Sequence, residues 1–160
     1  MSERPLKVLV IEDDAMLRGA IIEALGRDKQ ISTCEASGLI EGARLARTER
    51  QLVALVDLGL EDASGTEAVE VLVRTLPGAA IAVITGASGE VREACRAAGA
   101  HKVIEKGSTE SYGDGLISSI HEAVASRDAQ LLCAIPKARI EKIDAMVDRI
   151  LEKQKTKPPD

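Results

Sequence analysis

Carboxylate side chains gather at two points of this sequence. Glu12, Asp13 and Asp14 follow one apolar run, and Asp57 follows another. Carboxylates held close together repel one another, and a hard divalent cation such as Mg²⁺ or Mn²⁺ relieves that repulsion by binding their oxygens. If the fold brings these four acids together, they form a site for such a cation.

A hydroxyl and an amine complete the set. Thr85 ends a third apolar run, and Lys106 follows a fourth. Lys106 supplies a positive point charge for a phosphate, and Thr85 supplies a hydroxyl donor. A carboxylate beside a metal ion, an ammonium group and a hydroxyl is suited to phosphoryl transfer, with Asp57 as the nucleophile. A lone acid after a strand is usually only solvated, so the hypothesis depends on these residues meeting.

The elements that must position these residues alternate along the chain. Segments with apolar residues at helical spacing follow each of five short apolar runs, which are the predicted strands: 6–11, 30–35, 52–56, 79–84 and 103–104. Parallel strands need crossover helices, so the pattern predicts an α/β fold with a doubly wound, five-stranded parallel sheet. Ligands of such sheets bind beyond the carboxyl ends of the strands, where the acids, the hydroxyl and the amine lie. Ser64 and Glu67 have capping-box spacing, which predicts a helix start there.

The composition excludes several classes of function. A net charge of −5 and a pI near 5.2 provide no basic field for nucleic acid. With one Tyr and no Phe or Trp, the chain lacks stacking platforms for bases, and its core must be aliphatic. No apolar run is long enough for a membrane span, and the first residues have no signal-peptide pattern. Cys34, Cys95 and Cys133 have no paired spacing, so we expect reduced thiols in a cytoplasmic protein.

The sequence resembles the receiver domains of bacterial two-component response regulators in four motifs. The motifs are residues 6–14 followed by Arg18, 56–65, 84–87 and 103–106. The resemblance covers roughly residues 5–125. It implies a flavodoxin-like sheet with strand order 2-1-3-4-5, which the chemotaxis regulator also has.

The resemblance also implies a role for each residue that matches a motif. Asp57 matches the phosphoacceptor, which takes a phosphoryl group from a sensor histidine kinase or a phosphotransfer protein with Mg²⁺ as cofactor. Asp13 matches a direct Mg²⁺ ligand and Glu12 a water-mediated one. The number of residues between the acids and Arg18 decides which two of the three acids match the acidic pair of the family. Asp14 is then a neighbour of the site and not a ligand.

Three further positions carry over in the same way. Asp57 and the backbone carbonyl of Gly59 match the remaining protein ligands of the metal. Thr85 matches the switch hydroxyl that binds the phosphoryl group. Lys106 matches the lysine that pairs with the phosphate.

Three residues depart from the receiver pattern. Gly107 follows Lys106 where the family usually has Pro, so we expect a trans bond and a different loop there, because a cis bond before Gly costs about 2.5–4 kcal/mol. Glu61 stands where many receivers have Pro, which predicts a looser loop after Asp57. Val103 stands where the aromatic switch residue often lies, so signalling must use a different rearrangement.

The chain is predicted to divide into a receiver domain, residues 1–126, and a helical C-terminal extension, residues 127–160. After Pro136, apolar residues recur at helical spacing, and residues 155–160 resemble a frayed end. The extension is too short for a DNA-binding domain. We expect a helical hairpin around Pro136 that mediates a homodimer, with docking on its own receiver or on another protein as alternatives. The apolar residues are Ile140, Ile143, Val147, Ile150 and Leu151.

The expected function is a response regulator, a phosphoprotein of a two-component system or phosphorelay. It acts in signal transduction through contacts with an unknown output protein, and it catalyses only its own phosphorylation and dephosphorylation. A phosphorylation-independent adaptor is one alternative, and the retained site residues argue against it. An Asp-nucleophile, metal-dependent phosphohydrolase is another, but haloacid-dehalogenase-like enzymes need a second Asp where this chain has Gly59.

Overall fold

The computed structural model describes residues 4–49, 51–63 and 65–155, the last three of them by their backbone only. Ser64 of the predicted capping box and residues 156–160 of the predicted frayed end lie outside the described residues. The chain divides into two compact units, residues 1–127 and 128–160, and each is described by itself.

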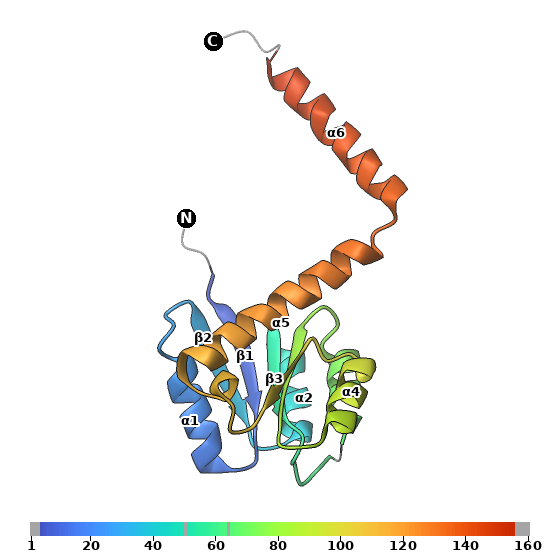
Figure 1. Cartoon of the computed structure of the whole chain (residues 1–160). Coiled ribbons are helices and arrows are strands. Elements are labelled where there is room, and N and C mark those ends of the chain that lie inside the picture. Colours follow the sequence, from blue (N-terminus) through green and yellow to red (C-terminus); the bar gives the residue numbers. More distant parts are fainter. Residues whose placement is uncertain (1–3, 50, 64, 156–160) are drawn as a thin grey trace. The chain divides into compact units, whose positions relative to one another are not determined.

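A parallel sheet forms the centre of the first unit (Figure 1). Neighbouring strands pair in parallel in the order β2-β1-β3-β4-β5, which confirms the predicted doubly wound sheet and its strand order. The strands are β1 (Leu6–Ile11), β2 (Ile31–Ala36), β3 (Val53–Asp57), β4 (Ala80–Thr85) and β5 (Lys102–Glu105).

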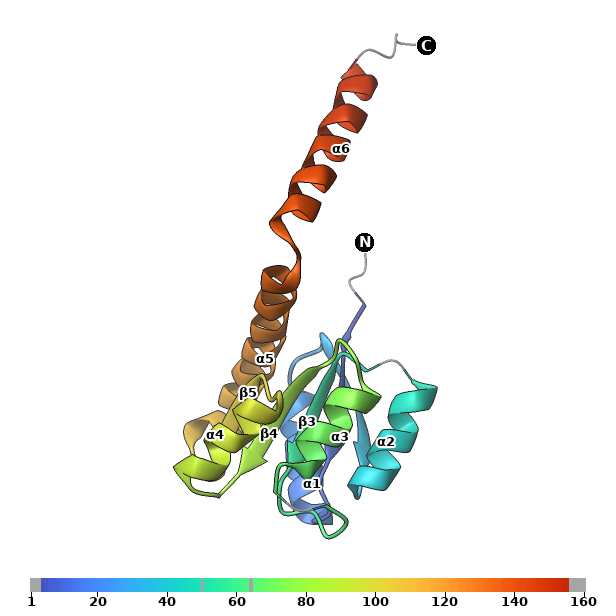
Figure 2. The ribbon, with the colours of Figure 1, turned by 90° about the vertical axis from the view of Figure 1, so that its right-hand side faces the viewer.

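The first five helices alternate with these strands and cover both faces of the sheet (Figure 2). A short 3-10 turn at Thr109–Ser111 precedes the long helix that follows β5. The helices are α1 (Ala15–Leu25), α2 (Leu39–Thr48), α3 (Glu67–Thr75), α4 (Gly89–Ala98), α5 (Gly113–Ala134) and α6 (Lys137–Lys155).

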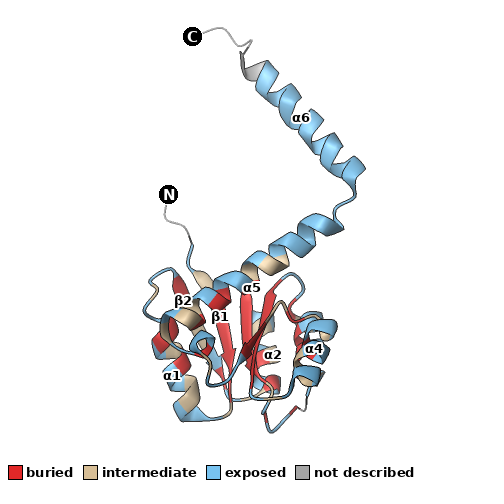
Figure 3. Cartoon of the chain, viewed as in Figure 1, coloured by how far each residue is buried: buried red, intermediate tan, exposed pale blue. Residues whose placement is uncertain are grey.

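Apolar side chains fill the space between the sheet and the helices on each face. Ile11 and Val56 pack with buried residues of α2, α3 and α4, while Val10 and Leu55 pack on the other face with those of α1 and α5. Every residue of β3 and β4 is buried, which is why both strands are nearly continuous apolar runs in the sequence (Figure 3). The core is aliphatic, as predicted, and the single Tyr, Tyr112, is exposed.

The second unit contains α6, so the predicted helical extension is confirmed. Pro136 suits the start of this helix because it has no N–H group to satisfy. Its carbonyl accepts the N–H groups of Arg139 at 2.8 Å and of Ile140 at 3.3 Å. The described side chains of α6 are all exposed (Figure 3). The hairpin around Pro136 stays a prediction.

Candidate metal centre and phosphoacceptor site

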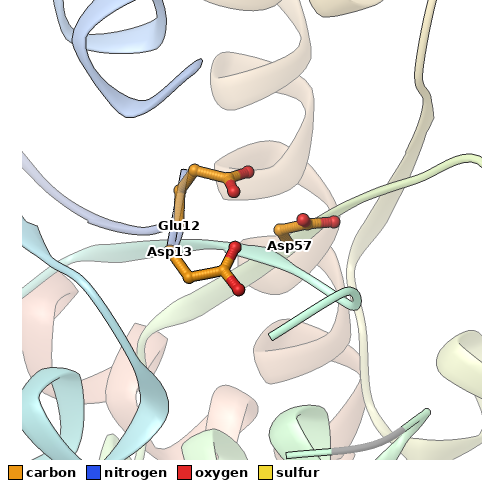
Figure 4. A group of neighbouring side chains, drawn as sticks. All are labelled: Glu12, Asp13 and Asp57. Atoms are coloured by element: carbon orange, nitrogen blue, oxygen red, sulfur yellow. The ribbon is translucent and has the colours of Figure 1, made fainter. Parts of the chain in front are cut away.

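Three of the four acids noted in the sequence meet at the carboxyl ends of β1 and β3. Glu12 and Asp13 follow β1, and Asp57 ends β3 (Figure 4). Because Ile11 pairs with Val56 across the two strands, the residues that follow them are neighbours. One carboxylate oxygen from each acid lies within 4.8 Å of the other two. Glu12 and Asp57 are buried and Asp13 is half-buried, so solvent screens their mutual repulsion poorly.

Asp14, which the match to the receiver motif makes a neighbour of the site and not a ligand, does not join this group. Asp14 is the N-cap of α1, and its Oδ1 accepts the N–H groups of Met16 at 2.8 Å and Leu17 at 3.0 Å. Its carboxylate therefore satisfies the first turn of the helix. This capping role provides a physical reason for the register that leaves Asp14 outside the site.

Arg18 fixes the turn that carries the acids. Its Nη1 donates to the backbone carbonyl of Glu12 at 2.7 Å, and its Nε donates to Glu35 Oε2 at 3.1 Å. The guanidinium thus ties the end of β1 to the neighbouring strand β2. In the sequence, Arg18 only helped to align the acids with the receiver motif. In the structure it holds the ends of β1 and β2 together.

The Glu12 carboxylate is buried and only partly hydrogen-bonded. Its Oε1 accepts the N–H of Asp14 at 3.1 Å, while its buried Oε2 has no hydrogen-bond donor among the described residues. Burial raises the pKa of Glu12 to about 7; the N–H of Asp14 opposes this, and the Asp57 charge adds to it. Asp13 adds to the rise too, because the two carboxyl groups can share a hydrogen bond only when one is protonated. A cation, or water bound to one, would satisfy this oxygen.

Lys106 reaches the cluster from the end of β5. Its Nζ donates to Asp57 Oδ2 at 2.9 Å. Burial lowers the pKa of Lys106, but the hydrogen bond and charge of Asp57 outweigh it, and the net pKa is raised, which keeps the amine charged. The Asp57 side chain is only 6% exposed whereas that of Lys106 is 37% exposed, so the ion pair opens toward solvent on the lysine side.

Thr85 lies beside Asp57 in the sheet. Ile84 pairs with Asp57 across β3 and β4, so Thr85 is one residue further along the neighbouring strand. Its side chain is buried, and its Oγ1 accepts the N–H of Ala87 at 3.0 Å. Accepting this bond orients the hydroxyl and leaves its own proton to be donated.

The backbone at Gly59 passes directly beside the Asp57 carboxylate. A Cβ at Gly59 would lie 3.2 Å from Asp57 Oδ2, tighter than an ordinary contact. Gly59 therefore keeps open the space next to the carboxylate. Together with the oxygen-only donor set and the unpartnered Glu12 oxygen, this space fits a small hard cation.

The loop after Asp57 has a tether that the sequence reading missed. Asp62 Oδ1 accepts the N–H of Leu39 at 2.9 Å, and Oδ2 accepts that of Ile40 at 3.0 Å. These are the first residues of α2, whose own N-cap, Gly38, has no side chain to cap with. The two bonds hold the pKa of Asp62 below its usual range. Gly38 offers no capping side chain, but nothing in the sequence identifies Asp62 as the residue that replaces it.

Two of the three departures from the receiver pattern have clear local consequences. No cis peptide bond occurs within the described residues, and Gly107 has a φ of +83°, which Pro cannot adopt. The loop after Lys106 therefore differs from a Lys–Pro loop, as expected. Val103 is buried on the α3–α4 side of the sheet in the same cluster as Cys95 and Ala100, with no ring to swing.

Comparisons with known proteins agree with this fold. A family model described as the response regulator receiver domain matches residues 8–112. A CheY-like receiver domain protein from Methanospirillum hungatei is 25% identical, with a TM-score of 0.69 over 79% of this chain and 98% of that chain. The response regulator domain of Thermotoga maritima CheB is 18% identical, with a TM-score of 0.67 over 76% and 98% of the two chains.

A response regulator protein from Burkholderia pseudomallei, solved with a phosphorylated aspartic acid, a calcium ion and citrate, is 23% identical. Its TM-score is 0.66, over 95% of this chain and 87% of that chain. The search of curated proteins finds no match. Within the described part of the chain, no helix is both long and apolar enough to cross a membrane. Because the family model spans more than half of the chain, this protein belongs to the response regulator receiver domain family.

Proposed function

We propose that this chain is a phosphoacceptor switch that takes a phosphoryl group on Asp57 in a Mg²⁺-dependent reaction. The donor is a phosphohistidine on a sensor histidine kinase or phosphotransfer protein. An oxygen of the Asp57 carboxylate attacks phosphorus as the phosphorus–nitrogen bond to the donor breaks. The contact of 2.9 Å between Lys106 Nζ and Asp57 Oδ2, beside the cluster of three acids, is the observation that carries this proposal.

The residues that would hold Mg²⁺ are Asp13, Asp57 and the backbone carbonyl of Gly59, with Glu12 acting through a bound water. The ion supplies positive charge to the oxygens of the transferring phosphoryl group. The chain's own residues do the rest: Asp57 is the nucleophile, and the buried wall around it limits water. The unpartnered Oε2 of Glu12 supports this assignment.

Lys106 and Thr85 would then bind the product. The ammonium group of Lys106, which pairs with Asp57 in the unmodified protein, would pair with a phosphoryl oxygen. The Thr85 hydroxyl would donate to a second one. Since Val103 replaces the usual ring, the change at Thr85 must pass through the loop from Thr85 to α4. The fold neighbour from Burkholderia pseudomallei, which holds a phosphorylated aspartic acid, supports this chemistry.

Incubation with Mg²⁺ and acetyl phosphate tests the proposal. Intact-mass spectrometry should detect one added phosphoryl group on the wild type and none on Asp57→Asn. Asp14→Asn is the matched control, since Asn also caps helices and Asp14 lies outside the cluster. Unlabelled wild type would support an adaptor that does not use phosphorylation, and multiple-turnover hydrolysis of phosphate esters would support a phosphohydrolase.

The output, we propose, is a protein contact made in the cytoplasm and not DNA binding. The first candidate is a homodimer through the C-terminal helices. In α6, Ile140, Ile143, Val147 and Ile150 are between 39% and 50% exposed, which is unusual for large apolar residues at regular spacing. Light scattering on the full chain should give a dimer, and Ile143→Asp should convert it to a monomer. A wild type that is monomeric at all concentrations would refute this output.

A further inference from the structure

The exposed apolar residues of α6 follow the repeat of a coiled coil. Ile140, Ile143, Val147 and Ile150 are separated by three, four and three residues. This is the alternation of the a and d positions of a heptad, with Ile140 and Val147 at a and Ile143 and Ile150 at d. A seam of this kind is buried by another helix with the same repeat, and α6 of a second copy provides one.

The residues that flank the seam distinguish a parallel pair from an antiparallel one. In this register Arg139 and Met146 occupy g, and Asp144 and Leu151 occupy e. In a parallel pair, each g residue faces the e residue of the next heptad on the other helix. Arg139 then meets Asp144 of the second copy, and the symmetric pair forms on the other side.

The second pair of flanking positions agrees with the first. Met146 meets Leu151 of the second copy, and both side chains are apolar and at least half exposed in the single chain. An antiparallel pair instead places e against e and g against g. Asp144 would then face Asp144 or Leu151, and neither is a charge partner. The parallel arrangement satisfies both flanking pairs.

We infer that α6 of one chain pairs in parallel and in register with α6 of a second copy, held by the a and d seam and by reciprocal Arg139–Asp144 ion pairs. The inference rests on the proposed homodimer and adds its orientation. It implies that the amino-terminal ends of the two α6 helices, and hence the segments that lead into them, are brought together. Light scattering on the full chain distinguishes this pair from a bundle of three or four copies, which branched side chains at both a and d favour.

Cysteine crosslinking on the full chain tests the orientation. The exposed Cys133 is first replaced by Ser. In that background Ile140→Cys and Ile150→Cys are made separately, given different affinity tags, mixed and oxidised with copper phenanthroline. A parallel pair crosslinks each variant to itself and not to the other. An antiparallel pair does the reverse, because residue 140 then lies opposite residue 150. Ala138→Cys, on the outer face of α6, is the control that should not crosslink.

Charge reversal provides an independent test. Arg139→Glu should weaken self-association about five-fold, since two exposed ion pairs at roughly 0.5 kcal/mol each are lost. Adding Asp144→Lys to that variant should restore wild-type affinity only in a parallel pair. Crosslinking between the two variants with no rescue would overturn the parallel inference and leave the homodimer standing. Absence of any crosslink together with a monomeric mass would overturn the homodimer itself, and with it this inference.

Discussion

The bonds from Asp62 to the start of α2 lead to a specific prediction about stability. Asp62→Ala removes the acceptors of the Leu39 and Ile40 N–H groups, and no other side chain among the described residues caps the helix at Gly38. Loss of a cap costs about 1 kcal/mol, and loss of the negative charge at the helix N-terminus adds ~0.3–1 kcal/mol. We therefore expect the free energy of unfolding to fall by about 1–2 kcal/mol, with a melting temperature roughly 5 °C lower.

The pH dependence of this effect has a defined sign. The two N–H bonds lower the pKa of Asp62 in the folded state, so its contribution is fully present above the ordinary Asp value near 4. It is lost as the pH falls through the lower, folded-state pKa. The difference between wild type and Asp62→Ala should thus be constant from pH 5 to 8 and shrink in acid.

Urea unfolding followed by circular dichroism measures this difference. Asp62→Asn keeps one carbonyl acceptor and should lose about half as much stability as Asp62→Ala. Glu61→Ala, an exposed acid in the same loop, is the matched control and should behave like the wild type. If Asp62→Ala is as stable as Glu61→Ala, or if its deficit grows in acid, the capping interpretation is refuted.

Three further predictions concern the acid cluster. Asp13→Ala should abolish the rise in melting temperature on adding Mg²⁺, whereas Asp14→Asn should retain it, because only Asp13 belongs to the cluster; thermal melts with and without Mg²⁺ decide this, and the reverse pattern would disprove the register. Without Mg²⁺, the free energy of unfolding of the wild type should fall as the pH rises from 5 to 8, because the raised pKa of Glu12 makes its ionisation unfavourable in the folded state. Glu12→Gln should flatten this dependence on pH in urea titrations, and an unchanged dependence would contradict the prediction. Gly59→Ala should slow labelling by acetyl phosphate without unfolding the protein, because its Cβ would lie 3.2 Å from Asp57 Oδ2; a time course by intact mass checks this, and wild-type kinetics would show that the space is not needed.

The sheet was predictable because its central strands, above all β3 and β4, are buried on both faces. Segments such as 79–84 are apolar throughout and alternate with helical patterns, which leaves a parallel arrangement as the natural solution. Once the strands are parallel and in order, the ends at Asp57 and Thr85 must be neighbours. The strand order itself came from the resemblance to receivers, since residue patterns alone do not determine which strands are adjacent.

The features that could not be predicted are of two kinds. Some depend on contacts between segments that are distant in the sequence, and others depend on which of two roles, helix cap or metal ligand, one acid takes. Asp62 caps a helix that begins 23 residues earlier in the chain, and no local pattern records this. Asp14 has the same chemistry as Asp13, and only the backbone of α1 decides that it caps the helix. The unpartnered oxygen of Glu12 likewise depends on packing around the whole site.

Mapping the modified residue shows whether Asp57 is the phosphoacceptor. After incubation with acetyl phosphate and Mg²⁺, borohydride reduces an aspartyl phosphate to homoserine, and peptide mass spectrometry locates it. We expect reduction at Asp57 alone, present with Mg²⁺ and absent when EDTA replaces it. Reduction at Asp13 or Asp14, or labelling of Asp57 that does not depend on a divalent cation, would contradict it.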